Sequence, residues 1–94
     1  MEYNKSTGVI RDKDNQYRWP VELTRAEMRI AEVLFDWKWH SMEEVEEKTG
    51  IEGQRRRVQI SKMKKKIKRY IEIKIDRKGG RYRCVKIKKK QERQ

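Results

Sequence analysis

Residues 54–69 read QRRRVQISKMKKKIKR, a stretch that is both the most basic part of the chain and helical in its periodicity. At 100° per residue, Ile60, Met63 and Ile67 fall on one narrow arc. An apolar arc of this kind packs against a core. The stretch therefore predicts an amphipathic helix, and the rest of the chain must supply the core that covers its apolar side.

The opposite face of this predicted helix carries hydrogen-bond donors and cations around a single apolar side chain, Val58. The residues that fall within about 60° of Val58 are Gln54, Arg55, Ser61, Lys62, Lys65 and Arg69. Arg and Lys can neutralise phosphates or donate to guanine, Gln can pair with adenine, and a branched apolar side chain can contact a thymine methyl group. This face therefore suits the major groove of duplex DNA.

We divide this face into two parts. Recognition helices insert their N-terminal residues first, so we expect Gln54, Arg55 and Val58 to read base edges. The residues expected to contact phosphates are Ser61, Lys62, Lys65 and Arg69. The simpler interpretation is a solvated basic face, since many surface helices are rich in Lys, but the charge distribution and the other predicted elements favour groove binding.

The charge of the chain is divided sharply along its length. The 94 residues carry a net charge of +12, with a pI near 10.0. Residues 1–52 contain 8 Lys and Arg against 12 Asp and Glu, a net −4, whereas residues 53–94 contain 19 against 3, a net +16. A half-molecule this basic indicates a polyanionic partner, either nucleic acid or an anionic membrane.

The remaining patterns predict one small α+β domain, residues 7–88, between a flexible N-terminus, residues 1–6, and a basic disordered tail, residues 89–94. Two short extended segments, residues 8–11 and 16–23, flank a polar turn. They predict a small N-terminal β segment.

Two capping boxes predict the helices of the first half. Thr24 with Glu27 opens a helix that is apolar on two sides, with Trp37 on its main core-facing side, and Ser41 opens a short helix that stops at Gly50. The short helix carries four glutamates, which we expect to form a solvated acidic face: Glu43, Glu44, Glu46 and Glu47. A short connector then leads to the basic helix, an arrangement typical of a helix-turn-helix.

A β-hairpin is predicted after the basic helix. Ile71, Ile73 and Ile75 alternate with polar residues, as in a half-buried strand, and after a turn at residues 76–80 a second strand continues to Ile87. The tip is basic, and its cations are Arg77, Lys78 and Arg81. A tip of this kind can reach the minor groove, where the negative potential favours Arg.

Several classes of function lack support in the sequence. Cys84 is the only cysteine, so an intramolecular disulfide and a Cys-rich zinc site are excluded, and His40 is the only histidine. Gly79 and Gly80 do not stand between a strand and a helix, as in a nucleotide-binding loop. We expect no enzyme, no metal, no cofactor and no small-molecule ligand. No apolar run is long enough for a transmembrane helix or a signal peptide, so we expect a soluble intracellular (cytoplasmic) protein without membrane contact.

Four stretches resemble one protein family. Residues 58–67 read VQISKMKKKI, which is similar to the signature VHISRLRKKI. The shorter matches are Leu23-Thr24 with Glu27 to LT-x-x-E, Ser41 with Glu43, Glu44 and Val45 to S-x-E-E-L, and Lys78-Gly79 with Tyr82-Arg83 to RG-x-GYR. These motifs belong to the C-terminal DNA-binding domains of OmpR/PhoB-type response regulators, and the resemblance covers roughly residues 16–85.

The resemblance implies a winged helix-turn-helix that binds double-stranded DNA, with helix 54–69 in the major groove and the hairpin tip near residues 77–81 at the minor groove. It also implies homodimeric or tandem binding. No receiver domain precedes the module in this sequence, so we do not expect activation by phosphorylation. Arg56 stands where the family has an apolar residue, and Arg81 stands where it has a second wing glycine.

The main hypothesis is sequence-specific binding of duplex DNA by a transcriptional regulator, with a virus or a mobile element as one origin. Two alternatives remain open: an RNA-binding or ribosome-associated basic module, and a winged-helix adaptor that binds an acidic protein. Competition between duplex DNA, duplex RNA and heparin at fixed salt would distinguish these three functions.

Overall fold

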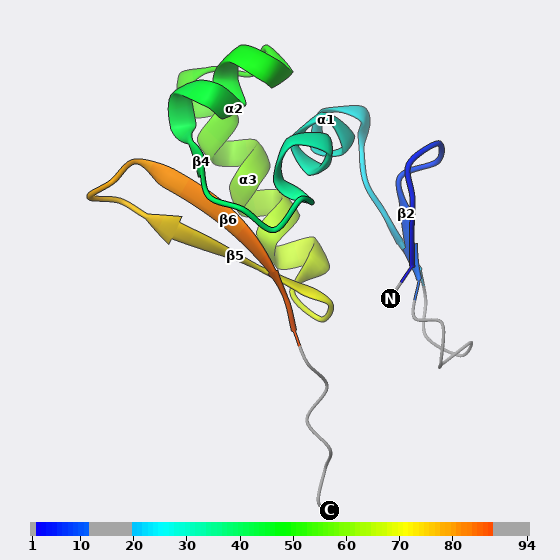
Figure 1. Ribbon diagram of the computed structural model, residues 1–94. Coiled ribbons are helices and arrows are strands. Elements are labelled where there is room, and N and C mark those ends of the chain that lie inside the picture. Colours follow the sequence, from blue (N-terminus) through cyan, green and yellow to red (C-terminus); the bar gives the residue numbers. More distant parts are fainter. Residues whose placement is uncertain (1, 12–19, 88–94) are drawn as a thin grey trace, which may run out of the picture.

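The computed structural model describes residues 2–11 and 20–87, and in these residues the chain is α+β, with three helices and two three-stranded antiparallel sheets (Figure 1). The helices are α1 (Arg25–Leu34), α2 (Met42–Thr49) and α3 (Gly53–Ile67). The first sheet has the order β1 (Glu2–Asn4), β2 (Val9–Arg11), β3 (Val21–Glu22). The second has the order β4 (His40–Ser41), β6 (Arg81–Lys86), β5 (Ile71–Asp76). The predicted α+β class is confirmed, and the arrangement is compatible with a winged helix.

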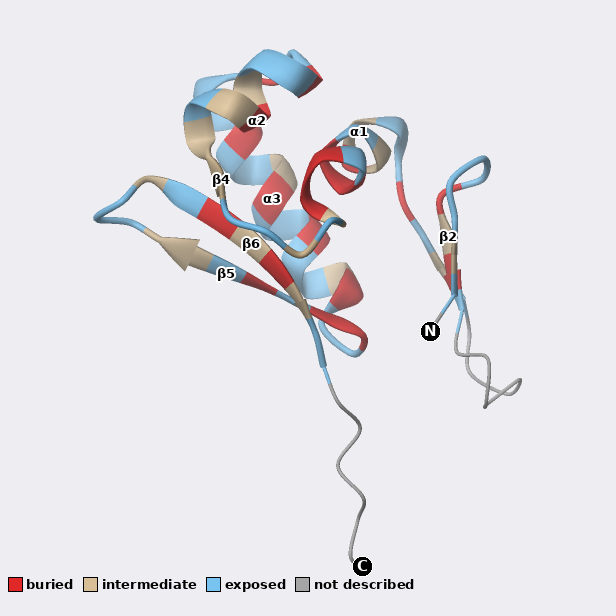
Figure 2. Ribbon diagram, in the orientation of Figure 1, coloured by how far each residue is buried: buried red, intermediate tan, exposed pale blue. Residues whose placement is uncertain are grey.

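The core lies where α1, α3 and the β5–β6 hairpin pack together (Figure 2). The predicted apolar arc of α3 is confirmed, because Ile60, Met63 and Ile67 are at most 2% exposed. Side chains of α1 and of the hairpin meet this arc, and those that are fully buried include Ile30, Leu34, Ile71, Ile73 and Cys84. Burial of this arc leaves the opposite side of α3 facing outward.

Thr24 caps the N-terminus of helix α1, and the predicted capping box is confirmed. The Thr24 hydroxyl accepts a hydrogen bond from the Glu27 amide at 3.2 Å, and Glu27 Oε1 accepts one from the Thr24 amide at 2.8 Å. The helix ends at Leu34, so the placement of Trp37 on a helical face is wrong. Trp37 lies in the following turn at a φ of 65° and reaches the core by stacking on Phe35, with ring centroids 5.6 Å apart.

Ser41 caps the N-terminus of α2 and Gly50 caps its C-terminus, as predicted. The Ser41 hydroxyl accepts from the Glu44 amide at 3.0 Å, and Gly50 has a φ of 74°, a left-handed conformation that favours glycine. The second half of the predicted capping box is absent, because the Glu44 carboxylate pairs with His40 and Lys48 instead.

Helix α3 begins one residue earlier than predicted, at Gly53, and ends at Ile67. Residues 68–70 form a turn before β5, so Arg69 lies just after the helix and not within it. The turn brings the chain back along the core side of α3, and Ile71 at the start of β5 is fully buried.

The predicted β-hairpin is confirmed. Ile73 lies opposite Cys84, and Asp76 lies opposite Arg81 at the tip. Strand β4 pairs with the other edge of β6, an association that the sequence did not predict. The prediction that Ile87 belongs to the second strand is wrong, since β6 ends at Lys86 and Ile87 is 43% exposed.

The N-terminal sheet contains strand β1, which the sequence did not predict, in a segment that we expected to be flexible. Within residues 2–6, strand β1 pairs with β2, and Tyr3 lies opposite Ile10. The Tyr3 ring also packs edge-on against Phe35 of the α1 C-cap, with centroids 4.9 Å apart, so one aromatic contact attaches a polar strand to the domain. In Figure 1 this sheet and the β5–β6 hairpin lie on opposite sides of α1. The predicted polar turn and the basic tail, residues 89–94, lie outside the described residues.

Candidate nucleic-acid interface

The outward face of α3 is open to solvent. Val58 is 40% exposed, although it is a large apolar side chain. The polar residues that the sequence predicts on this face are all exposed as well: Gln54, Arg55, Ser61, Lys62, Lys65 and Arg69. Among the described residues, no carboxylate forms an ion pair with any cation of this set. The predicted helical residues therefore share one accessible surface, and Arg69 follows at its C-terminal end.

A shallow hollow of about 790 Å³ lies along the first half of this face. Its lining residues are Gly53, Gln54, Arg56, Arg57, Val58, Ser61 and Lys62. The side chains offer amide, guanidinium, hydroxyl and ammonium donors around the apolar Val58. The hollow thus presents chiefly hydrogen-bond donors and positive charge, which suits a ligand rich in acceptors and negative charge.

The sequence reasoning missed a second row of cations beside this face. Arg57, Lys64 and Lys68 are exposed, and no described carboxylate pairs with them. Arg57 and Lys64 are seven residues apart, so they lie on the same side of the helix, about 100° to 120° from Val58. Their spacing was visible in the sequence, and they widen the basic surface on the side of Ser61.

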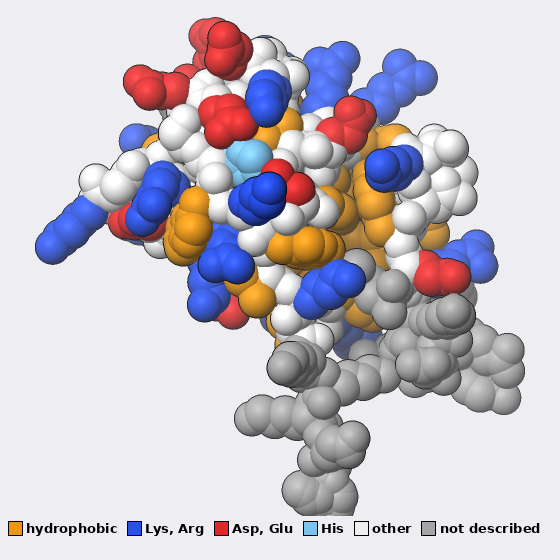
Figure 3. All heavy atoms as spheres, viewed as in Figure 1, with side chains coloured by type: hydrophobic (Ala, Val, Ile, Leu, Met, Phe, Trp, Pro, Cys, Tyr) orange, Lys and Arg blue, Asp and Glu red, His pale blue; other side chains and the backbone are white. Residues whose placement is uncertain are grey.

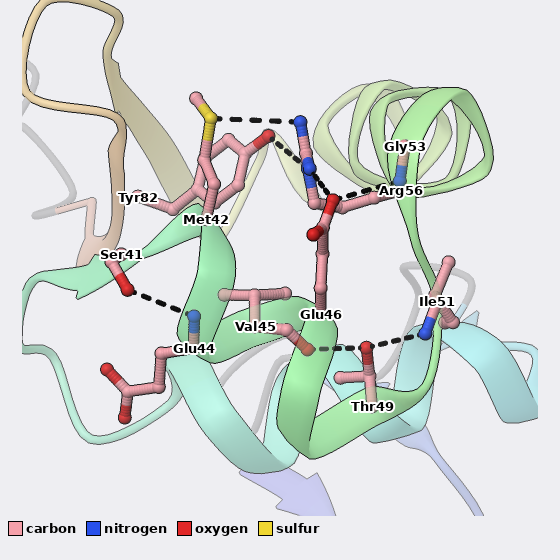
Figure 4. A network of polar contacts seen from close by, with 10 residues as sticks. All are labelled: Ser41, Met42, Glu44, Val45, Glu46, Thr49, Ile51, Gly53, Arg56 and Tyr82. Carbon is pink, nitrogen blue, oxygen red and sulfur yellow. Dashed lines mark hydrogen bonds and ion pairs between the residues drawn. The ribbon is translucent and has the colours of Figure 1, made fainter.

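One arginine of α3 points inward. Arg56 is 6% exposed, and its Nε donates to the Tyr82 hydroxyl at 3.1 Å. Its Nη1 pairs with Glu46 Oε2 of α2, and its Nη2 lies 3.7 Å from Met42 Sδ (Figure 4). Arg56 is therefore held by α2 and β6 and is not available as an external cation.

The contact with Arg56 also corrects the prediction of a uniformly solvated acidic face on α2. Glu46 is half-buried, because α2 turns this residue toward α3, and only Glu43 and Glu47 of the four glutamates are fully exposed. Figure 3 shows acidic side chains gathered over α2. The acidic surface is thus smaller than predicted, and Glu46 neutralises one arginine of the basic helix.

A second inward ion pair joins α3 to α1. Lys66 Nζ lies 2.7 Å from Glu27 Oε1 and donates to the Glu22 carbonyl at 3.1 Å. Glu27 is 1% exposed, and the same oxygen closes the capping box of α1. The sequence reasoning assigned no role to Lys66, because its partner lies 39 residues away.

The tip of the β5–β6 hairpin combines exposed cations with an internal bond. Arg77 and Lys78 are exposed, whereas Arg81 pairs with Asp76 Oδ2 at 2.7 Å and lies over the Trp39 ring, 4.9 Å from its centroid. The Gly79 amide donates to Asp76 Oδ1, and this bond, followed by the Arg81 contact, lowers the pKa of Asp76. Asp76 thus organises the tip and already has Arg81 as its partner.

His40 lies between two carboxylates at the start of α2. Its Nε2 is 2.8 Å from Asp36 Oδ1, and its Nδ1 is 2.9 Å from Glu44 Oε2, although the second contact lacks the angle of a hydrogen bond. Burial lowers the pKa of His40, but the hydrogen bond to Asp36 and the neighbouring Glu44 carboxylate outweigh burial and raise it. Within the described segments, no group of three or more His, Cys, Asp or Glu side chains is arranged to hold a metal ion.

Cys84 is fully buried in β6. Burial, with a smaller contribution from Asp36, raises the pKa of its thiol to about 12, so little reactive thiolate forms near neutral pH. In residues 2–11 and 20–87 there is also no helix with the length and hydrophobicity needed to cross a membrane.

A second hollow, of about 680 Å³, lies beside the C-terminal end of α1. Its aromatic lining comes from Tyr3, Phe35 and Trp37. Lys86 Nζ already lies 5.0 Å from the centroid of the Trp37 ring, so a cation of the chain itself occupies the aromatic face. This hollow lies among aromatic side chains and carries none of the residues predicted to bind nucleic acid.

Comparisons with protein-family models, with curated proteins and with solved structures found no match to this chain. The resemblance to the OmpR/PhoB-type effector domains therefore stays a prediction that depends on the motifs of the sequence.

Proposed function

We propose that this chain is a winged-helix module that binds double-stranded DNA in a sequence-specific manner and regulates transcription. In this proposal α3 enters the major groove, and the tip of the β5–β6 hairpin lies at the minor groove. The protein acts in the cell interior, where duplex DNA is accessible, and binds as a pair or in tandem because one small module offers limited specificity.

The observation that carries the proposal is the sorting of charge on α3. The inward cations are neutralised by glutamates, whereas the outward cations surround the exposed Val58 and, among the described residues, have no carboxylate partner. A helix with so many exposed cations on its surface is typical of a protein with a polyanionic partner. Duplex DNA supplies phosphates for the cations and a thymine methyl group for Val58.

The groove-facing residues have distinct roles in this proposal. Gln54, Arg55 and Val58 in the first turns of α3 contact base edges. The residues that contact phosphates are Ser61, Lys62, Lys65 and Arg69, together with Arg57, Lys64 and Lys68. In the wing, Arg77 and Lys78 contact DNA directly, while Arg81 supports the tip through Asp76 and binds DNA only when it exchanges that partner.

Selection of binding sites from a random duplex pool tests the proposal directly. We expect enrichment of one sequence, and repeated half-sites if the protein binds in pairs. Binding of the enriched duplex is then challenged with random duplex DNA, duplex RNA and heparin at fixed salt. Equal competition by all three would contradict specific DNA recognition. Stronger competition by duplex RNA than by random duplex DNA would favour the alternative of an RNA-binding module.

Substitution of Arg55 tests the base-reading assignment. Arg55→Ala should lower the preference for the selected duplex over random duplex by about 1 kcal/mol or more, because an arginine contact to a base edge discriminates by that amount. Val58→Ala should act in the same direction by loss of the methyl contact. If Arg55→Ala weakens binding to both duplexes equally, Arg55 contacts phosphate and does not read bases.

A further inference from the structure

The guanidinium of Arg56 joins three elements at one buried point (Figure 4). It extends from α3, pairs with Glu46 of α2 through Nη1, and donates from Nε to the Tyr82 hydroxyl of β6 at 3.1 Å. Its carbon also lies 5.9 Å from the centroid of the Tyr82 ring. Arg56 is 6% exposed and Tyr82 is 3% exposed, so water has little access to these bonds.

Besides its ion pair with Arg56, Glu46 makes a second contact with the first turn of α3. Its Oε2 accepts a hydrogen bond from the Gly53 amide at 2.9 Å. Gly53 is the first residue of α3, and the N-cap residue, Glu52, makes no side-chain capping bond of its own. Gln54 and Arg55, the first two residues proposed to read bases, therefore lie between two points that one carboxylate oxygen fixes to α2.

Tyr82 fixes the other side of the network to the wing. It lies in the central strand of its sheet, opposite His40 of β4 and Ile75 of β5. The hydrogen bond from Arg56 consequently sets the rotation of α3 relative to the strands that carry the hairpin tip. The same network thus links the two parts of the proposed interface, although neither Arg56 nor Tyr82 is exposed enough to contact DNA through its polar atoms.

Packing alone does not explain a charge at this position. A buried ion pair gives little net stability relative to apolar side chains of similar volume, because desolvation of both charges offsets their attraction. Its bonds are directional, however, so it selects one orientation among several that an apolar contact would tolerate.

We propose that the network of Glu46, Arg56 and Tyr82 is a positioning device that fixes the first turns of α3 relative to the wing and thereby determines sequence discrimination. The inference rests on the proposed function, since discrimination between duplex sequences is what it explains. Arg56 is a positioning residue in this scheme, and the groove-facing residues make the contacts.

The double variant Glu46→Leu/Arg56→Met tests this role. It replaces both charges with apolar side chains and leaves the net charge unchanged, so the attraction to phosphates and its salt dependence should stay as in the wild type. We expect the ratio of affinities for selected and random duplex to fall about tenfold, the loss of one good base contact. Circular dichroism and thermal unfolding check that the variant is folded.

A control removes a more exposed ion pair, which lies on α2 outside the network. Glu44→Gln/Lys48→Met also keeps the net charge, and Lys48 lies 2.9 Å from Glu44 at the surface. Its affinity ratio should equal that of the wild type. Tyr82→Phe removes only the hydroxyl that Arg56 Nε contacts, so it should lower the ratio by about threefold while retaining the fold, even if the double variant does not fold.

The outcomes separate the two proposals. If the wild type discriminates and the double variant or Tyr82→Phe, shown to be folded, discriminates equally well, the positioning role is wrong and the proposed function stands. If the wild type itself binds selected and random duplex equally, the proposed function fails and the positioning role fails with it. A lower ratio with an unchanged salt dependence supports both proposals, because lost phosphate contacts would change the salt dependence.

Discussion

The cations of α3 fall into two groups that differ in their surroundings. The inward group, Arg56 and Lys66, pairs with glutamates of α2 and α1. The outward group is exposed and, within the described part of the chain, forms no ion pair: Arg55, Arg57, Lys62, Lys64 and Lys65. Arg55 and Arg56 are adjacent, as are Lys65 and Lys66, so the same residue type occurs in both groups one position apart.

The composition of the helix therefore overstates the charge that is available to a partner. A helical step of 100° separates adjacent side chains, so one can face α1 or α2 while the next faces solvent. The acidic half of the chain supplies Glu27 and Glu46, and these neutralise two cations of the basic half. The other cations of α3 face outward and are exposed.

Replacement of Arg56 by Ala should have the largest effect on stability. The change leaves Glu46 half-buried without its cation and Tyr82 without its donor, so we expect a loss of about 3 kcal/mol in the free energy of unfolding. Denaturation by urea measures it. Arg55→Ala, one residue away on the exposed side, should change the same free energy by less than about 0.5 kcal/mol. Equal losses for the two variants would contradict the division into inward and outward groups.

Replacement of Glu27 should give the next largest effect on stability. Glu27→Ala removes half of the capping box of α1 and the partner of Lys66, but Lys66 keeps its bond to the Glu22 carbonyl and is one-third exposed. We therefore expect a loss of about 2 kcal/mol, mainly from the cap and partly from the ion pair. Glu32→Ala, at an exposed position of the same helix, is the control and should have little effect. A small effect of Glu27→Ala would mean that the buried carboxylate contributes nothing to the attachment of α3 to α1.

The sequence predicted the local features of the fold well, because their signals lie within a few residues of each other. The capping box at Thr24, the stop at Gly50 and the alternation of Ile71 and Ile73 each depend on neighbours in the chain, and each was confirmed. Strand β1 was missed because a three-residue polar segment with a single Tyr carries no periodic pattern.

The partners of the inward cations could not be predicted from periodicity. The period of a helix gives the direction of a side chain but not the residue that it meets, and Glu46 and Glu27 are 10 and 39 residues away from their partners. Two signals for an inward Arg56 were available in the sequence: the helical period places it on the apolar arc, and the family that the chain resembles has an apolar residue there. A cation at a core-facing position requires an acid nearby. This requirement argues against the prediction that all four glutamates of α2 face solvent.

The neighbours Lys65 and Lys66 should differ in their effect on the salt dependence of DNA binding. Lys65→Ala should weaken binding to all duplexes alike and reduce the slope of log affinity against log salt by about one, since one phosphate contact is lost. Lys66→Met removes the same charge from the inward side and should leave the slope unchanged at a temperature at which the protein is folded. Equal changes of slope in the two variants would show that the ion pair with Glu27 does not withhold Lys66 from DNA.

His40 gives the smallest expected effect and extends the comparison to a charge that depends on pH. The contacts with Asp36 and Glu44 raise its folded-state pKa above the ordinary value of 6.5, while the pKa of each carboxylate is lowered, so in this window only the histidine of this cluster titrates. Because the folded state binds the proton more tightly, the stabilisation is fully present below pH 6.5 and is lost as pH rises through the folded-state pKa. Unfolding free energies measured from about pH 5 to pH 9 should therefore fall across this window in the wild type and stay flatter in His40→Gln. Parallel curves for the two proteins would show that Asp36 and Glu44 do not raise the pKa of His40 in the folded state.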